Sequence, residues 1–367
     1  MRKINCRIKQ GSPYAGLLLI LCIVLISGFV SCREDCPITP MDRSLSFESF
    51  GLEGETVNEI RIFENQLIAA TTSGLFITNI DEPNWQSMTT LSGKNLKAIE
   101  FLSSTHWIVS EWELEDGNLY FTKDGGRSWN LLENNFGREY DQNILDLEYD
   151  HDQKRLYATG YFVVAYSDDS GETWKTLIGD WDYLATGLDF VEKHPNKNEL
   201  WTGGQNAIEG IILCQYNLNS GTENCMIDLL DPVSSAKDVL FDEEDTGFVM
   251  VGAEAGITVS RDGGATWQLS KNDRDNYKFT FGLEKDFYNS NIIYSGGWLK
   301  KGSDKPQPLV LSVSNDNGQT WSDHTFSDDK IYGGVLDMTS YIDNGNQSLF
   351  LGLDKGGVYR VHINRPD

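Results

Sequence analysis

One eight-residue motif, S/T-x-D-x-G-x-S/T-W, recurs along this chain and constrains its fold more than any other feature. The four full copies read TKDGGRSW (122–129), SDDSGETW (167–174), SRDGGATW (260–267) and SNDNGQTW (314–321). Their starts are separated by 45, 93 and 54 residues, so one copy is missing near residue 215, where Gly221 keeps the glycine position. A second degenerate copy, TNIDEPNW, lies at 78–85. Self-similarity at a period of this length predicts a repeat architecture.

Short apolar segments fill the units between the motifs. Each full motif follows one such segment, for example LYFT (119–122) or GITVS (256–260), and another segment precedes it. These segments are rich in β-branched and aromatic residues and are separated by Gly, Asn and Asp, which predicts strands joined by turns. Four short strands in a unit of about 46 residues are typical of a propeller blade. Seven such units occupy residues 44–367, so we predict an all-β, seven-bladed β-propeller with four-stranded blades.

The last unit lacks a fourth strand. The segment SLSFESFGL (44–52) fits this place, because the apolar spacing that follows it also follows the motif tryptophans. We therefore expect the N-terminal strand to complete the last blade. Such closure removes the free sheet edges that otherwise promote aggregation.

The motif resembles the Asp box of BNR-repeat propellers, a superfamily that includes sialidases, sortilin-type receptors, xyloglucanases and propeller factors of photosystem II assembly. The resemblance implies that each box is the hairpin between the third and fourth strands of a blade. Aspartate can accept hydrogen bonds from turn amides, and tryptophan buries a large apolar area between sheets. We therefore expect structural roles for Asp124, Trp129, Asp169, Trp174, Asp262, Trp267, Asp316 and Trp321. The fold does not define the function, since the superfamily contains enzymes, receptors and assembly factors.

The first 31 residues carry the layout of an export signal. A basic segment, MRKINCRIK, precedes an apolar run from Ala15 to Val30 that is short for a membrane span. The run ends in FVSC, which predicts lipoprotein processing with a lipid on Cys32; cleavage by ordinary signal peptidase is the alternative. We expect a lipoprotein signal peptide at 1–31, an anchor linker at 32–43 and the propeller at 44–367. The expected location is the envelope of a Gram-negative bacterium, lipid-anchored at the outer membrane or cell surface.

The chain is strongly acidic. Its formal net charge is −25, and removal of residues 1–31, which hold four basic and no acidic groups, lowers it to −29. Such a surface repels phosphate backbones, so nucleic acid is not an expected partner, whereas cations and cationic groups are. The alternative is that the acidity only keeps an exported protein soluble.

Four cysteines remain after processing. Cys214 and Cys225 flank the place of the missing motif, and export permits disulfides, so we predict that these two residues pair. Cys32 is the lipidation site. Cys36 is then free or bound to another molecule.

The predicted first strands of the blades share an apolar column, which consists of Ile60, Ile99, Leu147, Leu188, Val239, Leu283 and Met338. Because side chains alternate faces along a strand, the flanking positions point the other way, toward the central channel. They hold Glu59, Arg61, Glu100, Asp146, Glu148, Asp189, Asp238, Glu284 and Asp337. Crowded carboxylates recruit a cation, so the channel is a candidate site for Ca²⁺ or a basic group, and no other cofactor is expected. The alternative is that they bind neighbouring backbone and water, with Arg61 paired to one of them.

The face opposite the boxes carries several long loops, and loops on a rigid scaffold are where binding residues collect. Their aromatic and basic residues can stack on a sugar, grip a peptide or hold a carboxylate. The candidate ligand-binding residues are Trp112, Arg138, Tyr140, Trp181, Tyr183, Arg274, Tyr277, Trp298 and Tyr332. The alternative is that these aromatic side chains only cap the blades.

Two classes of function fit this sequence. Resemblance to sialidases implies three arginines around a substrate carboxylate, but only Arg138 and Arg274 fall near the predicted site face, and no catalytic residue can be assigned. We therefore favour a lipid-anchored, non-catalytic binding or scaffold protein for a glycan or protein ligand. The alternative is a glycoside hydrolase of sialidase- or xyloglucanase-like type that uses carboxylates of the channel or the loops.

Overall fold

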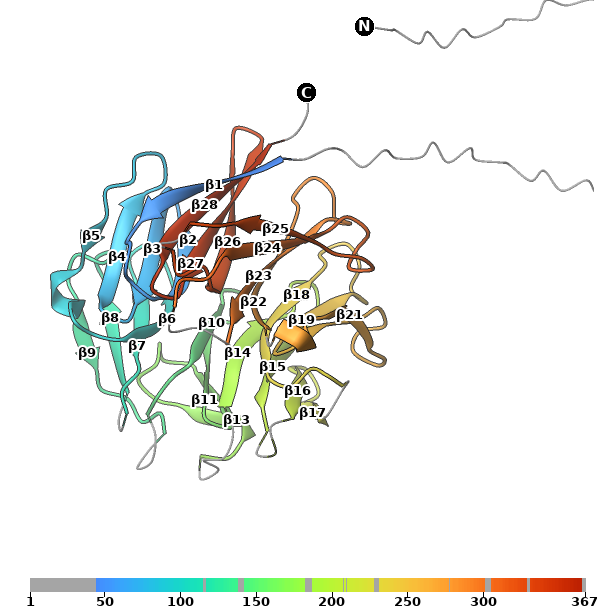
Figure 1. The fold of residues 1–367 in the computed structure, drawn as a ribbon. Coiled ribbons are helices and arrows are strands. Elements are labelled where there is room, and N and C mark those ends of the chain that lie inside the picture. The colour runs from blue at the N-terminus through green and yellow to red at the C-terminus, as the bar shows by residue number, and fades with distance from the viewer. Residues whose placement is uncertain are drawn as a thin grey trace, which may run out of the picture. The chain divides into compact units, whose positions relative to one another are not determined.

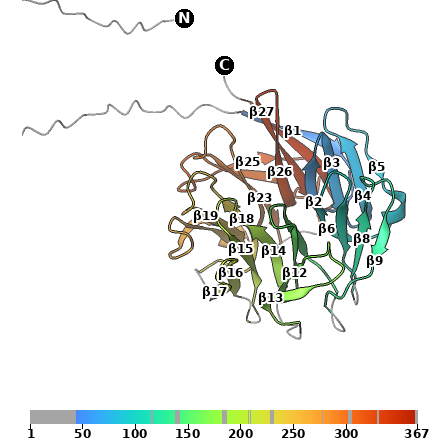
Figure 2. The ribbon, with the colours of Figure 1, turned by 180° about the vertical axis from the view of Figure 1, so that it is seen from behind.

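The computed structural model describes residues 44–114, 117–137, 142–181, 187–206, 208, 210–227, 231–276, 278–300, 305–328 and 331–364. These residues form seven four-stranded antiparallel sheets around a central axis (Figure 1, and Figure 2 from behind). The predicted all-β, seven-bladed propeller is therefore confirmed. The described residues also contain two 3₁₀ turns, η1 (Thr89–Leu91) and η2 (Arg274–Asn276). None of their helices has the length and apolarity needed to cross a membrane.

The first four blades follow the chain without interruption. Blade 1 comprises β2 (Val57–Phe63), β3 (Gln66–Thr71), β4 (Gly74–Asn79) and β5 (Gln86–Ser87). Blade 2 comprises β6 (Leu96–Phe101), β7 (Trp107–Glu111), β8 (Asn118–Thr122) and β9 (Asn130–Leu132). Blade 3 comprises β10 (Asp146–Asp150), β11 (Arg155–Gly160), β12 (Val163–Ser167) and β13 (Lys175–Gly179). Blade 4 comprises β14 (Gly187–Lys193), β15 (Glu199–Gln205), β16 (Ile211–Asn217) and β17 (Thr222–Ile227).

The last three blades complete the ring. Blade 5 comprises β18 (Ala236–Phe241), β19 (Val249–Ala253), β20 (Gly256–Ser260) and β21 (Gln268–Asn272). Blade 6 comprises β22 (Lys278–Lys285), β23 (Ile293–Leu299), β24 (Leu309–Ser314) and β25 (Ser322–Phe326). Blade 7 comprises β26 (Val335–Asp343), β27 (Asn346–Leu353), β28 (Gly357–Asn364) and the N-terminal β1 (Ser44–Gly51). β1 pairs antiparallel with β28, as predicted, so the N-terminal strand closes the last blade.

The ring has two faces. The face that carries the first-to-second-strand and third-to-fourth-strand hairpins is the box face. The opposite face, which carries the remaining connections, is the loop face. Because β1 begins where β28 ends, with Ser44 opposite Asn364, the chain enters the propeller at the box face.

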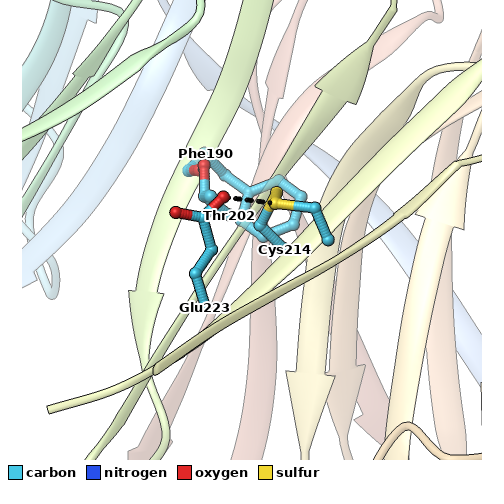
Figure 3. Close-up of a disulfide and its surroundings, with 5 residues drawn as sticks. Phe190, Thr202, Cys214 and Glu223 are labelled. Atoms are coloured by element: carbon cyan, nitrogen blue, oxygen red, sulfur yellow. Dashed lines mark hydrogen bonds between the residues drawn. A yellow bond between two sulfur atoms is a disulfide. The ribbon is translucent and has the colours of Figure 1, made fainter. Parts of the chain in front are cut away.

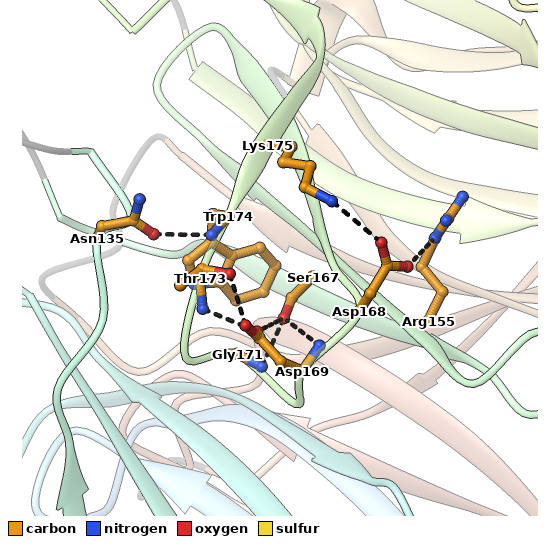
Figure 4. Close-up of polar contacts among 9 residues, drawn as sticks. All are labelled: Asn135, Arg155, Ser167, Asp168, Asp169, Gly171, Thr173, Trp174 and Lys175. Carbon is orange, nitrogen blue, oxygen red and sulfur yellow. Dashed lines mark hydrogen bonds and ion pairs between the residues drawn. The ribbon is translucent and has the colours of Figure 1, made fainter.

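Each full motif forms a hydrogen-bonded hairpin on the box face, which Figure 4 shows for blade 3. The Ser167 hydroxyl donates to Asp169 (2.7 Å) and accepts the N–H of Gly171 (2.8 Å). Asp169 accepts the backbone N–H (2.8 Å) and the hydroxyl (2.5 Å) of Thr173. The boxes that begin at Thr122, Ser260 and Ser314 repeat this pattern. The box aspartates are therefore committed to turn geometry.

Two consecutive residues of each box have positive φ, which explains the composition of its turn. They are Gly125 and Gly126, Ser170 and Gly171, Gly263 and Gly264, and Asn317 and Gly318. Glycine adopts this region without steric cost. At Gly264 a Cβ atom would also lie 2.6 Å from the Trp201 ring, so the turn backbone approaches the blade core too closely for another residue.

The box tryptophans close the seams between neighbouring blades. Trp129 packs in a core cluster with Ile77 of blade 1, and Trp174 packs in a cluster with Ile108 of blade 2. Each box tryptophan lies one residue before its fourth strand rather than beginning it, because the strand starts only after the turn bonds end. The degenerate box of blade 1 keeps this role, since Trp85 donates its indole N–H to the Phe50 carbonyl (2.7 Å) and packs at the seam with blade 7.

Blade 4 lacks a box and carries a disulfide instead. Cys214 of β16 and Cys225 of β17 lie directly opposite one another and form a disulfide bond (Figure 3). The link joins the third and fourth strands of the blade, the same pair that a box hairpin joins elsewhere in the ring.

Candidate functional site

The innermost strands surround a central channel, which is the candidate functional site. Its cavity has a volume of about 460 Å³. Eight acidic and four basic side chains are among its described lining residues, so the lining is acidic overall. The cavity is open to solvent, since the side chain of Arg61, which lines it, is 36% exposed.

Four carboxylates of the channel bind the free backbone edge of the innermost strands. Asp146 accepts the N–H groups of Leu147 and of Val191 in the next blade, both at 2.8 Å. Asp238 in the same way accepts those of Val239 and Leu283, both at 2.7 Å. Each carboxylate therefore joins its own blade to the next.

Asp337 and Glu59 are the other two carboxylates that accept inward N–H groups. Asp337 accepts the N–H groups of Met338 (2.9 Å) and Ile60 (2.7 Å), which joins blade 7 to blade 1. Glu59 accepts the N–H of Ile99 (2.6 Å) and the Nε–H of Arg61 (2.5 Å). Together these four carboxylates serve one inward N–H from every blade. A buried backbone N–H group without a partner costs free energy, so these four carboxylates have a structural role. This agrees with the alternative that the channel carboxylates bind neighbouring backbone.

The structure corrects the predicted alignment of blade 4. The apolar column of blade 4 lies three residues later than predicted, at Val191 rather than Leu188. Val191 lies two residues after the β-bulge of its strand at Asp189, and the apolar-column residues of blades 1, 2, 5, 6 and 7 lie two residues after an equivalent bulge. Asp189 still lines the cavity, where it pairs with Lys237 (2.8 Å), but the predicted channel position belongs to Glu192. Counting back from the side chain that opens the hairpin turn would have shown this. Glu192 lies two residues before His194, as Glu148 does before Asp150 and Glu284 before Asp286.

A second set of channel residues makes fewer hydrogen bonds within the protein than the first four carboxylates. It consists of Arg61, Glu100, Glu148, Glu192 and Glu284. Glu100 accepts the N–H of Phe101 (2.7 Å). Glu148 and Glu192 accept no hydrogen bond from another described residue. Burial raises the pKa of Glu100 to about 8, although Arg61 opposes the shift. Burial likewise raises the pKa of Glu192 and of Glu284 to about 7, and burial with the charge of Glu192 raises the pKa of Glu148.

These carboxylates do not form a preformed site for a small metal ion. Among the described residues, the only three metal-ligating side chains whose ligand atoms lie within 4.8 Å of one another are Cys214, Glu223 and Cys225. The two sulfur atoms of that group are bonded to each other in the disulfide. Among the described residues, no three channel carboxylates therefore have ligand atoms this close together.

The predicted loop-face residues that the structure describes are not gathered into one site. Trp181 is buried in the core of blades 2 and 3, where its ring packs edge-on against Phe136 at 4.9 Å, so its prediction as an exposed ligand contact is wrong. Burying the indole ring in this seam removes its apolar surface from water, which stabilises the fold more than leaving the ring exposed. Trp112 is half-buried directly after β7 of blade 2, where its backbone N–H donates to the Asn95 carbonyl (2.8 Å). Arg138, Tyr140, Tyr183 and Tyr277 lie outside the described residues.

Trp298 and Tyr332 are the two predicted loop-face residues that lie near one another. The Trp298 indole donates to Asp354 (3.0 Å), and Lys355 lies 5.5 Å from the centre of the Tyr332 ring. Both rings therefore flank the turn between β27 and β28. Arg274 is at a separate place on the loop face, where it pairs with Asp231 at 3.2 Å.

The described arginines do not converge on a common point. Arg61 lies in the channel on Glu59, and Arg155 lies on the box face on Asp168 (2.7 Å). Arg261 donates to the Asn317 carbonyl (2.7 Å), also on the box face, whereas Arg274 lies on the loop face. A sialidase site needs three arginines around one carboxylate, and the described part of the chain does not assemble it.

Comparisons with known proteins agree on the fold. No protein-family model matches the sequence, and no curated protein matches it. Among solved structures, YCF48 bound to D1 peptide is similar over 87% of this chain and 95% of that chain, at 14% identity and a TM-score of 0.61. The extracellular domain of BT3049, described as a hybrid two component system of B. thetaiotaomicron, is similar over 87% of this chain and 42% of that chain, at 13% identity and a TM-score of 0.61. At these identities the likeness establishes the propeller fold.

Proposed function

We propose that this chain is an exported Asp-box propeller, lipid-anchored at a Gram-negative envelope through Cys32, that binds a protein ligand without catalysis. The ligand places a lysine or arginine side chain in the acidic channel. The observation that carries this proposal is the pair Glu148 and Glu192, which accept no hydrogen bond from the described residues although burial raises the pKa of both. Glu192 lines the cavity.

A cationic side chain satisfies this channel better than water or a small ion. An opposite charge nearby favours the ionised form of a carboxyl group, so an entering cation would displace the protons that burial retains. The four N–H-bonded carboxylates fix the channel wall and leave the second set for the ligand. The peptide bound by the structurally similar YCF48 supports a protein ligand over a glycan, because it shows this fold in complex with a peptide.

Peptide binding to the mature protein, purified in mild detergent, tests the proposal. Labelled lysine-rich, glutamate-rich and uncharged peptides are compared by fluorescence anisotropy at low and high salt, with Glu148→Gln/Glu192→Gln as the test variant. Glu82→Gln, an exposed change on the box face, is the control. We expect salt-sensitive binding of the lysine-rich peptide only, weakened about tenfold or more by the double variant, as lost charge pairing predicts.

Two further arms separate the alternatives. Sialylated and plant or host polysaccharides are incubated with the protein, with and without EDTA, and new reducing ends are followed by mass spectrometry. Released sugar would overturn the non-catalytic proposal in favour of a glycosidase. Retention of an intact glycan that is unaffected by Glu148→Gln/Glu192→Gln would overturn the cationic protein ligand, and tight Ca²⁺ binding in calorimetry would replace it with a metal.

A further inference from the structure

Two neighbouring hairpins on the box face expose a group of apolar side chains, which we name the hairpin patch. Phe287 and Tyr288 lie in the hairpin between β22 and β23 of blade 6, and Ile342 lies at the end of β26 in blade 7. Their side chains are 65%, 47% and 37% exposed, in that order. The two aromatic rings pack edge-on at 5.0 Å.

The hairpin patch is held in place by partly buried hydrogen bonds. Gln347, which is buried in blade 7 opposite Ile342, accepts the N–H of Phe287 (2.9 Å) and donates to the Lys285 carbonyl (3.0 Å). Asp286 accepts the N–H groups of Tyr288 and Asn289, both at 3.0 Å. The patch is therefore a fixed surface that spans the seam between blades 6 and 7.

Hairpins of the same construction show that the fold does not require aromatic residues here. In blade 5, Asp242 accepts the N–H groups two and three residues later, as Asp286 does in blade 6, and the exposed residues after it are Glu243 and Glu244. In blade 3, Asp150 makes the same bonds and is followed by His151 and Asp152, which are also exposed. Of these three hairpins only that of blade 6 places two aromatic side chains at these positions, so the turn itself does not require them.

The patch is bordered by two acidic residues, Asp286, which is buried, and Asp343, which is half-buried. Between them, residues 287–292 (FYNSNI) and 344–350 (NGNQSLF) contain no ionisable group other than the Tyr288 phenol. Exposed apolar groups of this kind mark contacts with membranes or other molecules. Aromatic side chains are also enriched at the membrane–water interface.

The N-terminal chain enters the propeller beside this patch. Tyr341, Ser348, His362 and Ser46 lie in one row across blade 7, so Ile342 and Leu45 lie at the same level, one residue nearer the box face. They are separated by three strand spacings, roughly 14 Å at about 4.8 Å each. Figure 1 shows the β26–β27 hairpin beside the start of β1. Twelve residues, 32–43, separate the proposed lipid on Cys32 from β1, a reach of at most about 40 Å.

We propose that the hairpin patch docks on the headgroup region of the bilayer that holds the lipid anchor. This inference rests on the proposed anchor at Cys32. The tether keeps the patch at a high effective concentration near the bilayer, so a small apolar contact suffices to orient the molecule. The box face then points to the membrane, and the loop face with the opposite mouth of the channel points away from it, toward a ligand.

Lipid-quenching measurements on the full lipidated protein in vesicles test the orientation. In a Cys36→Ser background, single cysteines are introduced at Asn344, beside the patch, or at His151, the matched hairpin of blade 3 on the same face. Each is labelled with a fluorophore and exposed to phosphatidylcholine vesicles that contain headgroup spin-labelled lipid. We expect quenching at least threefold stronger at position 344 than at 151. The variant Phe287→Glu/Tyr288→Glu, which copies the blade 5 hairpin, should remove this difference while the protein still floats with the vesicles.

Other outcomes would overturn the inference. Equal quenching at both positions in a lipidated protein would refute membrane docking and leave the proposed anchor and ligand untouched. Protection of position 344 that depends on protein concentration in detergent would assign the patch to a second copy of the chain. An unmodified Cys32 in the intact mass would remove the tether, refuting this inference together with the anchor, whereas the peptide-binding test would stand on its own.

Discussion

Asp238 offers a direct test of the inner carboxylate ring. Its two oxygens accept the N–H groups of Val239 and Leu283, both at 2.7 Å, and so join blade 5 to blade 6. Asp238→Asn keeps the shape of the side chain but replaces one acceptor oxygen with an N–H₂ donor. One of the two backbone N–H groups then loses its acceptor and faces another donor.

The expected cost follows from that single unpaired group. A buried donor left without a partner costs about 1–3 kcal/mol, and water in the channel recovers part of this, so we expect a loss of about 1–2 kcal/mol in the free energy of unfolding. At an unfolding entropy of about 2.1 cal/mol/K per residue, the melting temperature of a propeller of this length would fall by about 1.5–3 °C.

Glu192→Gln is the matched control. Glu192 is a channel carboxylate as well, but it accepts no hydrogen bond from another described residue, and burial raises its pKa to about 7. At pH 8 its substitution removes a crowded charge without removing a hydrogen bond. Its melting temperature should therefore be unchanged or higher, measured for both variants by differential scanning calorimetry in the same buffer.

Two results would refute this reasoning. If Asp238→Asn melts at the wild-type temperature, the inter-blade hydrogen bonds contribute nothing measurable. If Glu192→Gln is destabilised as much as Asp238→Asn, removal of any channel carboxylate is harmful, and the division into a structural and an uncommitted set fails.

Three further predictions concern stability. Burial raises the pKa of Asp337 to about 8, above its value of about 4 in an unfolded chain. Between these two pH values the native state binds more protons than the unfolded state, so stability should fall as pH rises from about 4 to 8. A melting temperature that rises toward pH 8 would contradict this. Replacing Cys214 and Cys225 with Ser opens a loop of sequence separation 11 and should cost about 3 kcal/mol without loss of the β-sheet circular dichroism spectrum; an unchanged urea midpoint would mean that the link adds no stability. Asp316→Ala removes the acceptor of the Thr320 N–H and hydroxyl and should lower the melting temperature, whereas Glu133→Ala, an exposed change outside any box, should not.

The sequence was sufficient for the fold because the box motif is a local device. Its Ser or Thr, Asp and Gly bond to one another within eight residues, so their spacing reports a hairpin without knowledge of the rest of the chain. The period between boxes then gives the blade. Even the degenerate box of blade 1 could be recognised, since Trp85 keeps the position that seals a seam.

The candidate site was only partly accessible to the same reasoning. Alternation along strands identified most channel carboxylates, but in blade 4 the predicted alignment was three residues too early and so missed Glu192. Trp181 was assigned to the surface because it follows a strand in a polar loop sequence, although tertiary packing places it against Phe136.

The sequence by itself determined the β-propeller, the number of blades and the closing strand, because these follow from local hydrogen bonds and from periodicity. Only the tertiary structure decided which channel carboxylates are committed, since the N–H groups that Asp146, Asp238 and Asp337 accept include those of Val191, Leu283 and Ile60 in neighbouring blades. Such partners are 45 or more residues away along the chain. The carboxylates that precede the apolar column hold the ring together, and those that follow it do not; which of the two columns meets the backbone of the next blade depends on contacts that the local pattern does not record.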